Sequence, residues 1–303
     1  MLRLLFILGI FGCLACASST DRPIIGVLSL PTKSQYGRSY IAASYVKFLE
    51  AAGARVAPIK YTDSFETITN LFSSLNGVLF TGGGDELNGT YFAVEQLLFK
   101  LVLDANNRGE HVPLWGTCLG FEAISMIVAG GDIRTFCDAE NISMALEMEP
   151  TARNSRLFGG LTDTEYRTLS QKPVTLNNHQ WCLKTDTFAS SSLAEFFTLL
   201  STNADRAGMR FVSSMEGKKY PIFAVQWHPE KNPYEWLEDS AIVHSDESVG
   251  AVGSLARTFV REARQNGHHF ATLDAEWQSL IWNYSPVYTG KTHSDFEQTY
   301  FFA

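Results

Sequence analysis

The chain has 303 residues, of which 45% are hydrophobic and 18% are charged. This composition supports a substantial buried core and excludes a disordered chain. The formal net charge of -8 and the pI near 5.4 argue against a polyanionic partner, because a phosphate-binding surface needs clustered Lys and Arg. We therefore expect a folded protein that does not bind nucleic acid.

The first residues have the pattern of a secretory signal peptide. Arg3 supplies a positive charge, residues 4–14 are almost continuously apolar, and residues 15–17 (Ala-Cys-Ala) resemble a cleavage site. The apolar run is too short to span a bilayer comfortably, and no later segment resembles a membrane span. We predict that residues 1–19 are removed and that the mature protein is secreted or lysosomal. A bacterial lipoprotein signal ending at Cys16 is the alternative, although Cys13 stands where such signals usually carry an aliphatic residue.

Three sequons agree with a secretory route. They begin at Asn88, Asn141 and Asn283, and Pro286 makes the third the weakest. We predict N-glycosylation at these positions, with chance occurrence as the alternative for one or two of them.

Three cysteines follow the signal, namely Cys118, Cys137 and Cys182. An odd number in a secreted protein indicates either a reactive free thiol or an intermolecular disulfide. Their spacing contains no pair typical of a zinc site, so no metal is expected. The spacing leaves open whether Cys137 and Cys182 pair with each other.

Residues 23–130 alternate short apolar runs with longer amphipathic ones, which is typical of βαβ units. The predicted strands are residues 24–28, 55–59, 77–80 and 112–115, and the predicted helices are residues 40–52, 65–72, 91–107 and 118–128. Strands this apolar are covered on both faces. The pattern therefore predicts an α/β fold with a mostly parallel sheet and helices on either side.

Helical periodicity fades between residues 130 and 250. Residues 196–200, 209–213 and 222–225 are β-like and are predicted to continue the sheet in antiparallel fashion; residues 254–264 are predicted to form a last helix. The aromatic tail through Phe302 is expected to pack back on the body. Without an internal repeat or a long linker, residues 20–303 are predicted to form a single domain.

The strongest local signal is the run from Trp115 to Glu122, between a buried strand and a helix. Gly116 and Gly120 permit a tight bend, which would expose Cys118 at the carboxyl edge of the sheet. The adjacent helix N-terminus would favour the thiolate. This arrangement predicts a nucleophile, and the alternative is a buried structural cysteine.

A second signal, Gln226 to Glu230, follows another apolar strand. The imidazole of His228 can accept a thiol proton and return it to a leaving amine. Glu230 can orient that ring, as the third member of a catalytic triad does. Together the two signals favour a nucleophilic Cys118 over a structural one.

G-x-C-x-G-x-E after one strand and H-P-E after a later one resemble the class I glutamine amidotransferases. Within that group, residues 36–45, 115–122 and 226–236 resemble the γ-glutamyl hydrolase family, and the likeness covers the chain from Pro23 to about Gly290. The resemblance implies a three-layer αβα sandwich with a mostly parallel, flavodoxin-like sheet. It also implies that the protein works without metal or organic cofactor and forms a homodimer.

The resemblance also implies roles for individual residues. Cys118 corresponds to the nucleophile, His228 to the general base and Glu230 to the partner of that base. His179 resembles a histidine near the family's substrate site, and Tyr36 a tyrosine beside the nucleophile. For both, a purely structural role is the alternative.

An acyl transfer needs hydrogen-bond donors for the tetrahedral oxyanion. The glycine run after residue 81 is well placed for this, and the resemblance puts one of Gly82 and Gly83 there, opposite the N–H of Leu119. Read alone, the run is a flexible loop, and no Gly-Lys-Ser or Gly-Lys-Thr closes it as in a phosphate loop. The choice between Gly82 and Gly83 is left open.

The leaving group separates the functions that the resemblance allows. The chain has no room for a synthetase domain, and Glu122 stands where glutamine amidotransferases usually carry Gln, so both departures favour a hydrolase. Glu122 is also expected to contact substrate. We therefore expect hydrolysis by water of folyl or antifolyl poly-γ-glutamates. The alternatives are a hydrolase of other γ-glutamyl amides, a glutaminase on the same fold, and an inactive secreted binding protein.

Overall fold

A computed structural model describes residues 19–292 and 294–303 of the chain. The predicted secretory signal, except for its last residue, lies outside the described residues. Among the described residues, no helix is both long and apolar enough to cross a membrane.

The core of the molecule is an eight-stranded sheet with the order β4-β1-β5-β6-β12-β11-β10-β8. Its strands are β4 (Arg55–Ile59), β1 (Ile24–Leu28), β5 (Gly77–Phe80), β6 (Leu114–Thr117), β12 (Ile222–Val225), β11 (Arg210–Gly217), β10 (Phe197–Ala204) and β8 (Glu147–Met148). The first five are parallel, and β11, β10 and β8 continue in antiparallel pairing. The parallel part has the flavodoxin-like order, in which the second strand lies outside the first.

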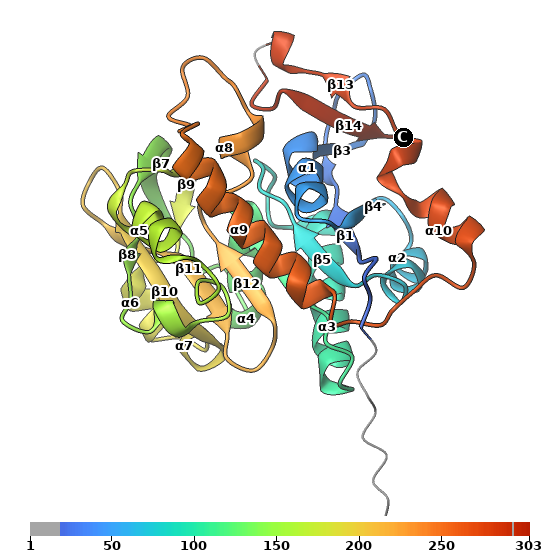
Figure 1. Cartoon of the computed structure of the whole chain (residues 1–303), viewed down its shortest axis with the longest axis horizontal. Coiled ribbons are helices and arrows are strands. Elements are labelled where there is room, and N and C mark those ends of the chain that lie inside the picture. The colour runs from blue at the N-terminus through green and yellow to red at the C-terminus, as the bar shows by residue number, and fades with distance from the viewer. Residues whose placement is uncertain (1–18, 293) are drawn as a thin grey trace, which may run out of the picture.

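Helices cover both faces of this sheet. One face packs on α1 (Ala43–Ala51) and α9 (Asp246–Ala263), and the other on α2 (Phe65–Phe72), α3 (Gly89–Asn107) and α4 (Leu119–Ala129). Figure 1 shows α1 and α9 in front of the sheet and α3 and α4 behind it. The three-layer αβα sandwich that the resemblance implied is confirmed. It forms because the parallel strands are buried on both faces.

Local capping residues set the ends of several helices. Ser64 and Ser245 accept a hydrogen bond from the third residue of α2 and α9, and Thr162 forms a capping box with Glu165 at α5 (Asp163–Gln171). α4 ends at Gly130, which has a φ of 75° that favours glycine. The short helices are α6 (Thr185–Ala189), α7 (Leu193–Phe196), α8 (Lys231–Tyr234) and α10 (Leu273–Ser279).

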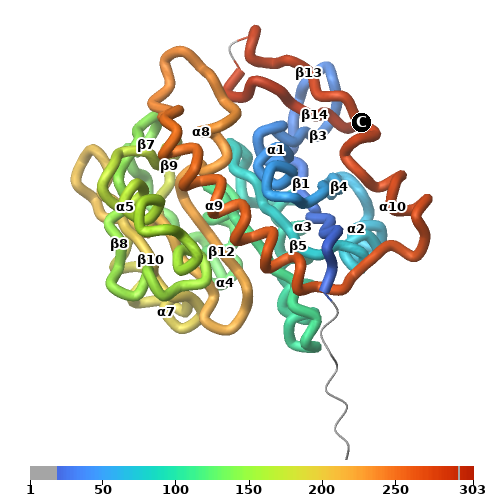
Figure 2. Tube along the Cα trace, viewed as in Figure 1, coloured from blue at the N-terminus to red at the C-terminus, as the bar shows by residue number. Residues whose placement is uncertain are grey.

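Two smaller sheets flank the carboxyl edge of the central one. The first has the order β13-β14-β3-β2 and joins β13 (Val287–Tyr288) and β14 (Gln298–Phe302) to β3 (Ser39–Ala42) and β2 (Leu30–Pro31). Figure 2 shows this return of the C-terminus to the N-terminal strands, as expected for the aromatic tail. The second pairs β7 (Thr135–Met144) with β9 (Thr175–Cys182).

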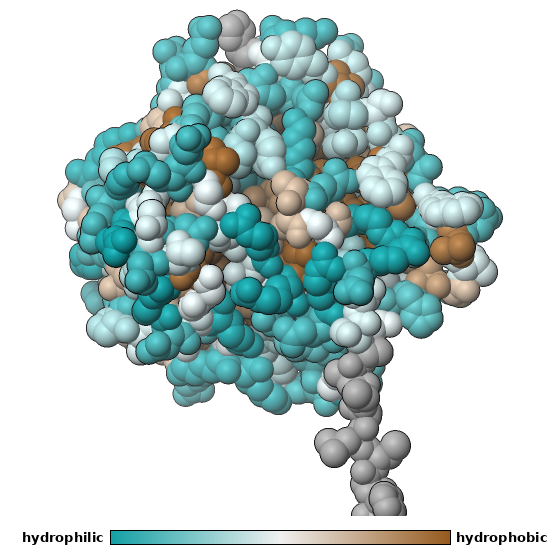
Figure 3. Space-filling view, in the orientation of Figure 1, coloured by the Kyte–Doolittle hydropathy of each residue, from teal (hydrophilic) through white to brown (hydrophobic). Residues whose placement is uncertain are grey.

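The surface shows no concentration of apolar residues on the side that Figure 3 presents. Hydrophobic residues occur there in small separate patches among hydrophilic ones, which is normal for a folded domain.

The structure departs from the predicted elements where local and tertiary preferences compete. Residues 40–42 form the end of β3 and not the start of a helix, because they pair with the C-terminal β14. The strand predicted at residues 112–115 lies two residues later, and α9 begins at Asp246, eight residues before the predicted start. The strand at residues 222–225 is antiparallel to β11 but parallel to β6, so the antiparallel continuation was only partly right.

Candidate active site

Three adjacent parallel strands end at the same edge of the sheet and place the chemistry there. β5 leads into the glycine run from Gly82, β6 into Cys118, and β12 into His228. Since β5 pairs with β6 and β6 pairs with β12, their carboxyl ends are neighbours. This is the edge at which open α/β sheets bind ligands.

Cys118 lies in a strained turn between β6 and α4. Its φ of 51° and ψ of -105° are rare for a residue with a side chain, and such backbone costs about 1–3 kcal/mol. A Cβ on Gly116 would lie 2.7 Å from the Gly120 oxygen, and one on Gly120 would lie 2.5 Å from the Phe80 oxygen. The turn therefore requires both glycines, as the sequence predicted.

Burial sets the acidity of the Cys118 thiol in this structure. The residue is only 4% exposed, and burial raises the pKa of the thiol well above its usual range, helped by the carboxylates of Glu122 and Glu230. The N–H of Leu119 at the start of α4 lowers the pKa but does not outweigh burial. The sequence-based expectation counted the helix N-terminus, which lowers the pKa of the thiol, and did not include burial, which raises it by more.

His228 and Glu230 form a buried pair. His228 Nδ1 lies 2.7 Å from Glu230 Oε1, and the two residues are 4% and 1% exposed. A carboxylate accepts from the Nδ1–H, so this contact leaves Nε2 as the ring atom free to accept a proton. The pair therefore has the geometry of a general base with its orienting acid.

Gly82 shows how closely the two strand ends approach. A Cβ placed there would lie 2.8 Å from His228 Cε1 and 3.0 Å from Cys118 Cβ. The distance between these two atoms of His228 and Cys118 therefore cannot exceed the sum of the two values. Cys118 and His228 also line one cavity of about 220 Å³, which we call the His228 cavity. Any side chain on Gly82 would collide with the imidazole.

The backbone N–H groups near Cys118 differ in what they bind. The Gly82 N–H donates to Tyr45 Oη at 2.7 Å. Among the described residues, the Gly83 N–H makes no hydrogen bond with the protein. Tyr45 is fully buried, and burial, followed by the charges of Glu230 and Cys118, raises the pKa of its hydroxyl.

A larger cavity of about 730 Å³ adjoins the His228 cavity and is also lined by Cys118, and we call it the Glu122 cavity. Glu122 Oε2 accepts from Arg134 Nη1 at 2.9 Å, and Oε1 accepts from Gln226 Nε2 at 3.2 Å. Burial raises the pKa of Glu122 to about 7 even though Arg134 opposes the shift. This cavity can therefore offer a substrate both charged and hydrogen-bonding groups.

His179 also lines the Glu122 cavity. Its Nδ1 lies 3.0 Å from the Trp181 carbonyl oxygen, and its Nε2 lies 3.0 Å from Asn177 Oδ1. Burial, then the charge of His228, lowers the pKa of His179 to about 3. His179 is therefore uncharged near pH 7 and does not act as a general acid there.

The Cys137–Cys182 pair forms a disulfide with an S–S distance of 2.08 Å, which answers the question that the spacing left open. Both sulfurs lie 3.6 Å from His179 Nδ1. These three residues could have suggested a metal site. They do not fit one, because disulfide sulfurs have no thiolate to offer a metal. Cys118 is the free cysteine among the described residues.

Tyr36 is not brought beside Cys118. It is half exposed, and its ring packs against Phe301 with the centroids 5.2 Å apart. Two other tyrosines of the same sequence run, Tyr40 and Tyr45, lie at the site instead, Tyr40 as part of the lining of the His228 cavity. The helical spacing from Ala42 onward could have indicated Tyr45, since it places that residue on the buried face of α1.

The three sequon asparagines are exposed but differ in their contacts. Asn88 lines the rim of the Glu122 cavity. Asn141 has a φ of 46°, and its side-chain amide bonds the backbone at Asp239 and Ala241. Asn283 donates to two backbone carbonyls through Nδ2. Asn88 Nδ2 donates only to the exposed Glu86 side chain, at 2.9 Å, whereas the amide nitrogens of the other two donate to backbone carbonyls, so a glycan would disturb the fewest backbone contacts at Asn88.

Comparison with known proteins places this geometry in a family. Residues 23–230 match the peptidase C26 family. The chain is 40% identical to a γ-glutamyl hydrolase of Homo sapiens, over 99% of this chain and 98% of that protein. The chain belongs to the peptidase C26 family.

Further relatives of this C26 chain come from distant eukaryotes. γ-Glutamyl hydrolase B of Dictyostelium discoideum is 40% identical over 93% of this chain and 83% of that protein. γ-Glutamyl hydrolase 1 of Arabidopsis thaliana is 36% identical over the same shares. The glutaminase domain of a Trypanosoma brucei CTPS, solved with bound acivicin, has a TM-score of 0.55 at 10% identity, covering 81% of this chain and 95% of that one. This last likeness confirms the class I glutamine amidotransferase-like fold.

Proposed function

We propose that the protein is a cysteine hydrolase of γ-glutamyl amide bonds, with folyl and antifolyl poly-γ-glutamates as its natural substrates. The family membership and the relatives' names support the bond type. The observation that carries the mechanism is the convergence of Cys118, His228 and Glu230 at two neighbouring strand ends.

The first half-reaction transfers the γ-glutamyl group to Cys118. Burial raises the pKa of the Cys118 thiol, so we infer that His228 Nε2 takes its proton as the sulfur attacks the γ-carbonyl carbon. Glu230 stabilises the resulting imidazolium through Nδ1. The C–N bond then breaks, His228 returns the proton to the leaving nitrogen, and a thioester forms on Cys118.

The second half-reaction releases the acyl group. His228 Nε2 accepts a proton from water, whose oxygen attacks the thioester carbonyl. The C–S bond breaks, the thiol regains its proton, and a free γ-carboxylate leaves. No metal or redox partner enters this balance of protons and electron pairs.

The oxyanion of each tetrahedral intermediate needs two donors. We assign them to the N–H groups of Leu119 and Gly83, because Gly82 donates to Tyr45. Each such donor contributes about 3–4 kcal/mol to the transition state in comparable sites. Glu122, Arg134 and His179 line the Glu122 cavity and are proposed to bind the γ-glutamyl unit.

The cellular setting belongs to the same proposal. The signal-like residues 1–19, the exposed sequons and the disulfide support a secreted or lysosomal glycoprotein. We also propose a homodimer. Light scattering of the purified protein, with and without deglycosylation, tests both the oligomer and the glycans.

A substrate panel tests the activity. Purified protein is incubated with pteroyl-γ-pentaglutamate, glutamine and a γ-glutamyl alkylamine, and the products are separated over time. Shortened pteroyl glutamates with free glutamate or γ-glutamyl peptides are expected from the first substrate, at a kcat/KM at least about 100-fold above the other two. Faster release of ammonia or of the alkylamine would overturn the substrate assignment, and no reaction with any of the three would overturn the enzyme assignment.

A further inference from the structure

Lys231 is a buried cation next to the nucleophile without an acidic partner. The residue is 5% exposed, and its Nζ donates to the Asp295 carbonyl oxygen at 3.3 Å and lies 4.7 Å from the Phe296 ring centroid. In the part of the chain that the structure describes, no carboxylate oxygen lies within 4.0 Å of Nζ. Burial raises the pKa of Glu235 and the charge of Lys231 opposes that shift, but the two groups make no direct ion pair, so an incoming anion can form the close contact that this ammonium lacks.

The position of His228 tells which part of the substrate meets Lys231. His228 and Lys231 both line the His228 cavity, and neither lines the adjoining Glu122 cavity. A general acid must reach the leaving nitrogen to protonate it. The leaving group therefore occupies the His228 cavity, and the acyl group occupies the Glu122 cavity.

A glutamate leaving group brings a carboxylate to this place. In a γ-glutamyl-glutamate bond, the amide nitrogen is bonded to the Cα that carries the α-carboxylate, so this anion enters the His228 cavity together with the nitrogen. A simple amine or ammonia would bring no such anion. With such a leaving group, the Lys231 ammonium would keep only the Asp295 carbonyl and the Phe296 ring as partners.

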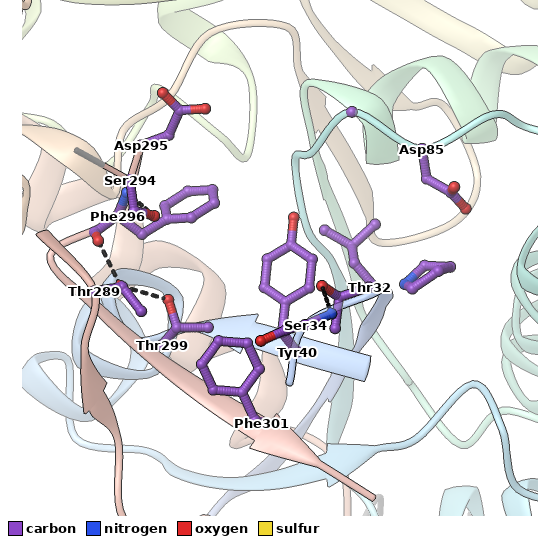
Figure 4. A pocket seen from close by; sticks show the side chains of 13 residues that line it. Thr32, Ser34, Tyr40, Asp85, Thr289, Ser294, Asp295, Phe296, Thr299 and Phe301 are labelled. Carbon is purple, nitrogen blue, oxygen red and sulfur yellow. Dashed lines mark hydrogen bonds between the residues drawn. The ribbon is translucent and has the colours of Figure 1, made fainter. Parts of the chain in front are cut away.

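The neighbouring cavity offers an anion no basic side chain among its described residues. This aromatic cavity of about 390 Å³ shares Tyr40, Asp295 and Phe296 with the His228 cavity. Figure 4 shows the Tyr40 hydroxyl between two carboxylates, Asp295 on one side and Asp85 on the other. Among the described residues that line it, none is a Lys or Arg. Glu140 and Asp295 also line the His228 cavity, but Lys231 lines it too, so an incoming carboxylate finds a basic side chain there that the described lining of the neighbouring cavity lacks.

We propose that Lys231 binds the α-carboxylate of the leaving glutamate and thereby selects γ-glutamyl-glutamate bonds over other γ-glutamyl amides. The inference rests on the proposed function and adds the residue that reads the leaving group. In this role Lys231 is a substrate-binding residue with no part in the bond-breaking itself.

A matched pair of substrates tests the proposal. Pteroyl-glutamyl-γ-glutamate is compared with the same compound ending in 4-aminobutyrate, which differs only by the missing α-carboxylate. The wild type is expected to prefer the first by about 10- to 100-fold in kcat/KM, the range of a charged hydrogen bond. Lys231→Met is expected to reduce this ratio toward one, mainly through KM, and Lys231→Arg to retain most of it.

The control is Lys219→Met. Lys219 is an exposed lysine that also lies over an aromatic ring, 4.8 Å from the Tyr220 centroid, but far from the cavities that Cys118 lines. This variant is expected to keep the wild-type ratio. A wild-type ratio near one, or a Lys231→Met ratio equal to that of the wild type, overturns the inference alone. Absence of hydrolysis of both substrates by the wild type overturns the proposed function with it. If Lys231→Met does not fold, the wild-type and Lys231→Arg ratios decide.

Discussion

Cysteine and histidine lie together in two regions of the molecule. One region holds Cys118 and His228, and the other holds the Cys137–Cys182 disulfide and His179. Both are buried, and Cys118 and His179 line the same Glu122 cavity. In the first region the sulfur is a free thiol in a strained turn, and a carboxylate orients the imidazole. In the second the sulfurs are bonded to each other, and a backbone carbonyl and an amide fix the imidazole. Proximity of Cys and His alone therefore does not make a nucleophile.

Removing the sulfur atoms of each region should give the largest difference in kcat between the two regions. Cys118→Ala is expected to lower kcat by about 10⁴- to 10⁶-fold, because no other group can form the thioester. The double variant Cys137→Ala/Cys182→Ala is expected to keep kcat within about 10-fold at low temperature, since neither sulfur takes part in the chemistry. Hydrolysis rates of both proteins, measured with unchanged circular dichroism spectra, check this. Substantial activity in Cys118→Ala would exclude it as the nucleophile.

A smaller loss is expected when the carboxylate beside His228 is neutralised. Glu230→Gln keeps the shape but loses the charge that stabilises the imidazolium, so kcat should fall by about 10²- to 10⁴-fold. Glu235→Gln is the matched control, another buried glutamate that accepts a backbone hydrogen bond outside the cavities lined by Cys118. Steady-state kinetics should separate the two variants. Equal kcat values for them would contradict the triad.

Removal of the disulfide should lower the stability of the protein, whereas removal of the Cys118 thiol should lower the rate of hydrolysis. The Cys137–Cys182 bond closes a loop with a sequence separation of 45, and its removal is expected to lower the free energy of unfolding by about 2–4 kcal/mol. Cys118→Ala should change the same quantity by less. Denaturant unfolding of the double variant, Cys118→Ala and the wild type measures the difference, and equal unfolding midpoints in all three would refute the structural role.

The two histidines should also differ in how pH acts on them. Burial holds the pKa of His179 at about 3, whereas an unfolded histidine takes up a proton below about 6.5. The contribution of His179 to the free energy of unfolding is therefore fully present near pH 7 and is lost as the pH falls toward 3. At pH 4.5 the loss is about 2–3 kcal/mol. In His179→Asn this loss should vanish, so the stability gap to the wild type should narrow in acid. Unfolding at pH 7.0 and 4.5 measures the gap, and a gap that widened in acid would mean that His179 is charged.

The first half of the fold could be predicted from the sequence because its elements are locally self-consistent. β1, β4 and β5 are continuous apolar runs, and α2 and α3 have clear helical spacing, so residues 24–107 were placed nearly correctly. The pairing of β7 with β9 and helix α5 was missed. Those strands are half exposed and irregular in register, and α5 carries a capping box with few apolar residues.

The candidate site was predictable where a strand end fixes a residue, and not where partners come from elsewhere. Cys118 and His228 follow β6 and β12 directly, so their meeting at one edge followed from a parallel sheet. The raised thiol pKa depends on complete burial, which no motif specifies. Helical spacing could indicate that Tyr45 is buried, but its hydrogen bond with Gly82 and the contact of Lys231 with the segment around Asp295 are visible only in three dimensions.

The covalent state of Cys118 during turnover tests the account most directly. Wild-type protein is mixed with pteroyl-γ-glutamate substrate, quenched in acid within the first turnovers, digested and analysed by mass spectrometry. We predict a mass increase equal to the acyl group on the peptide that contains Cys118. This increase should be absent from Cys118→Ala. It should be larger in Glu230→Gln if that substitution slows hydrolysis of the thioester more than its formation. An acyl group on any other residue would contradict the account, as would hydrolysis at full rate with no acylated peptide in a quench fast enough to capture it.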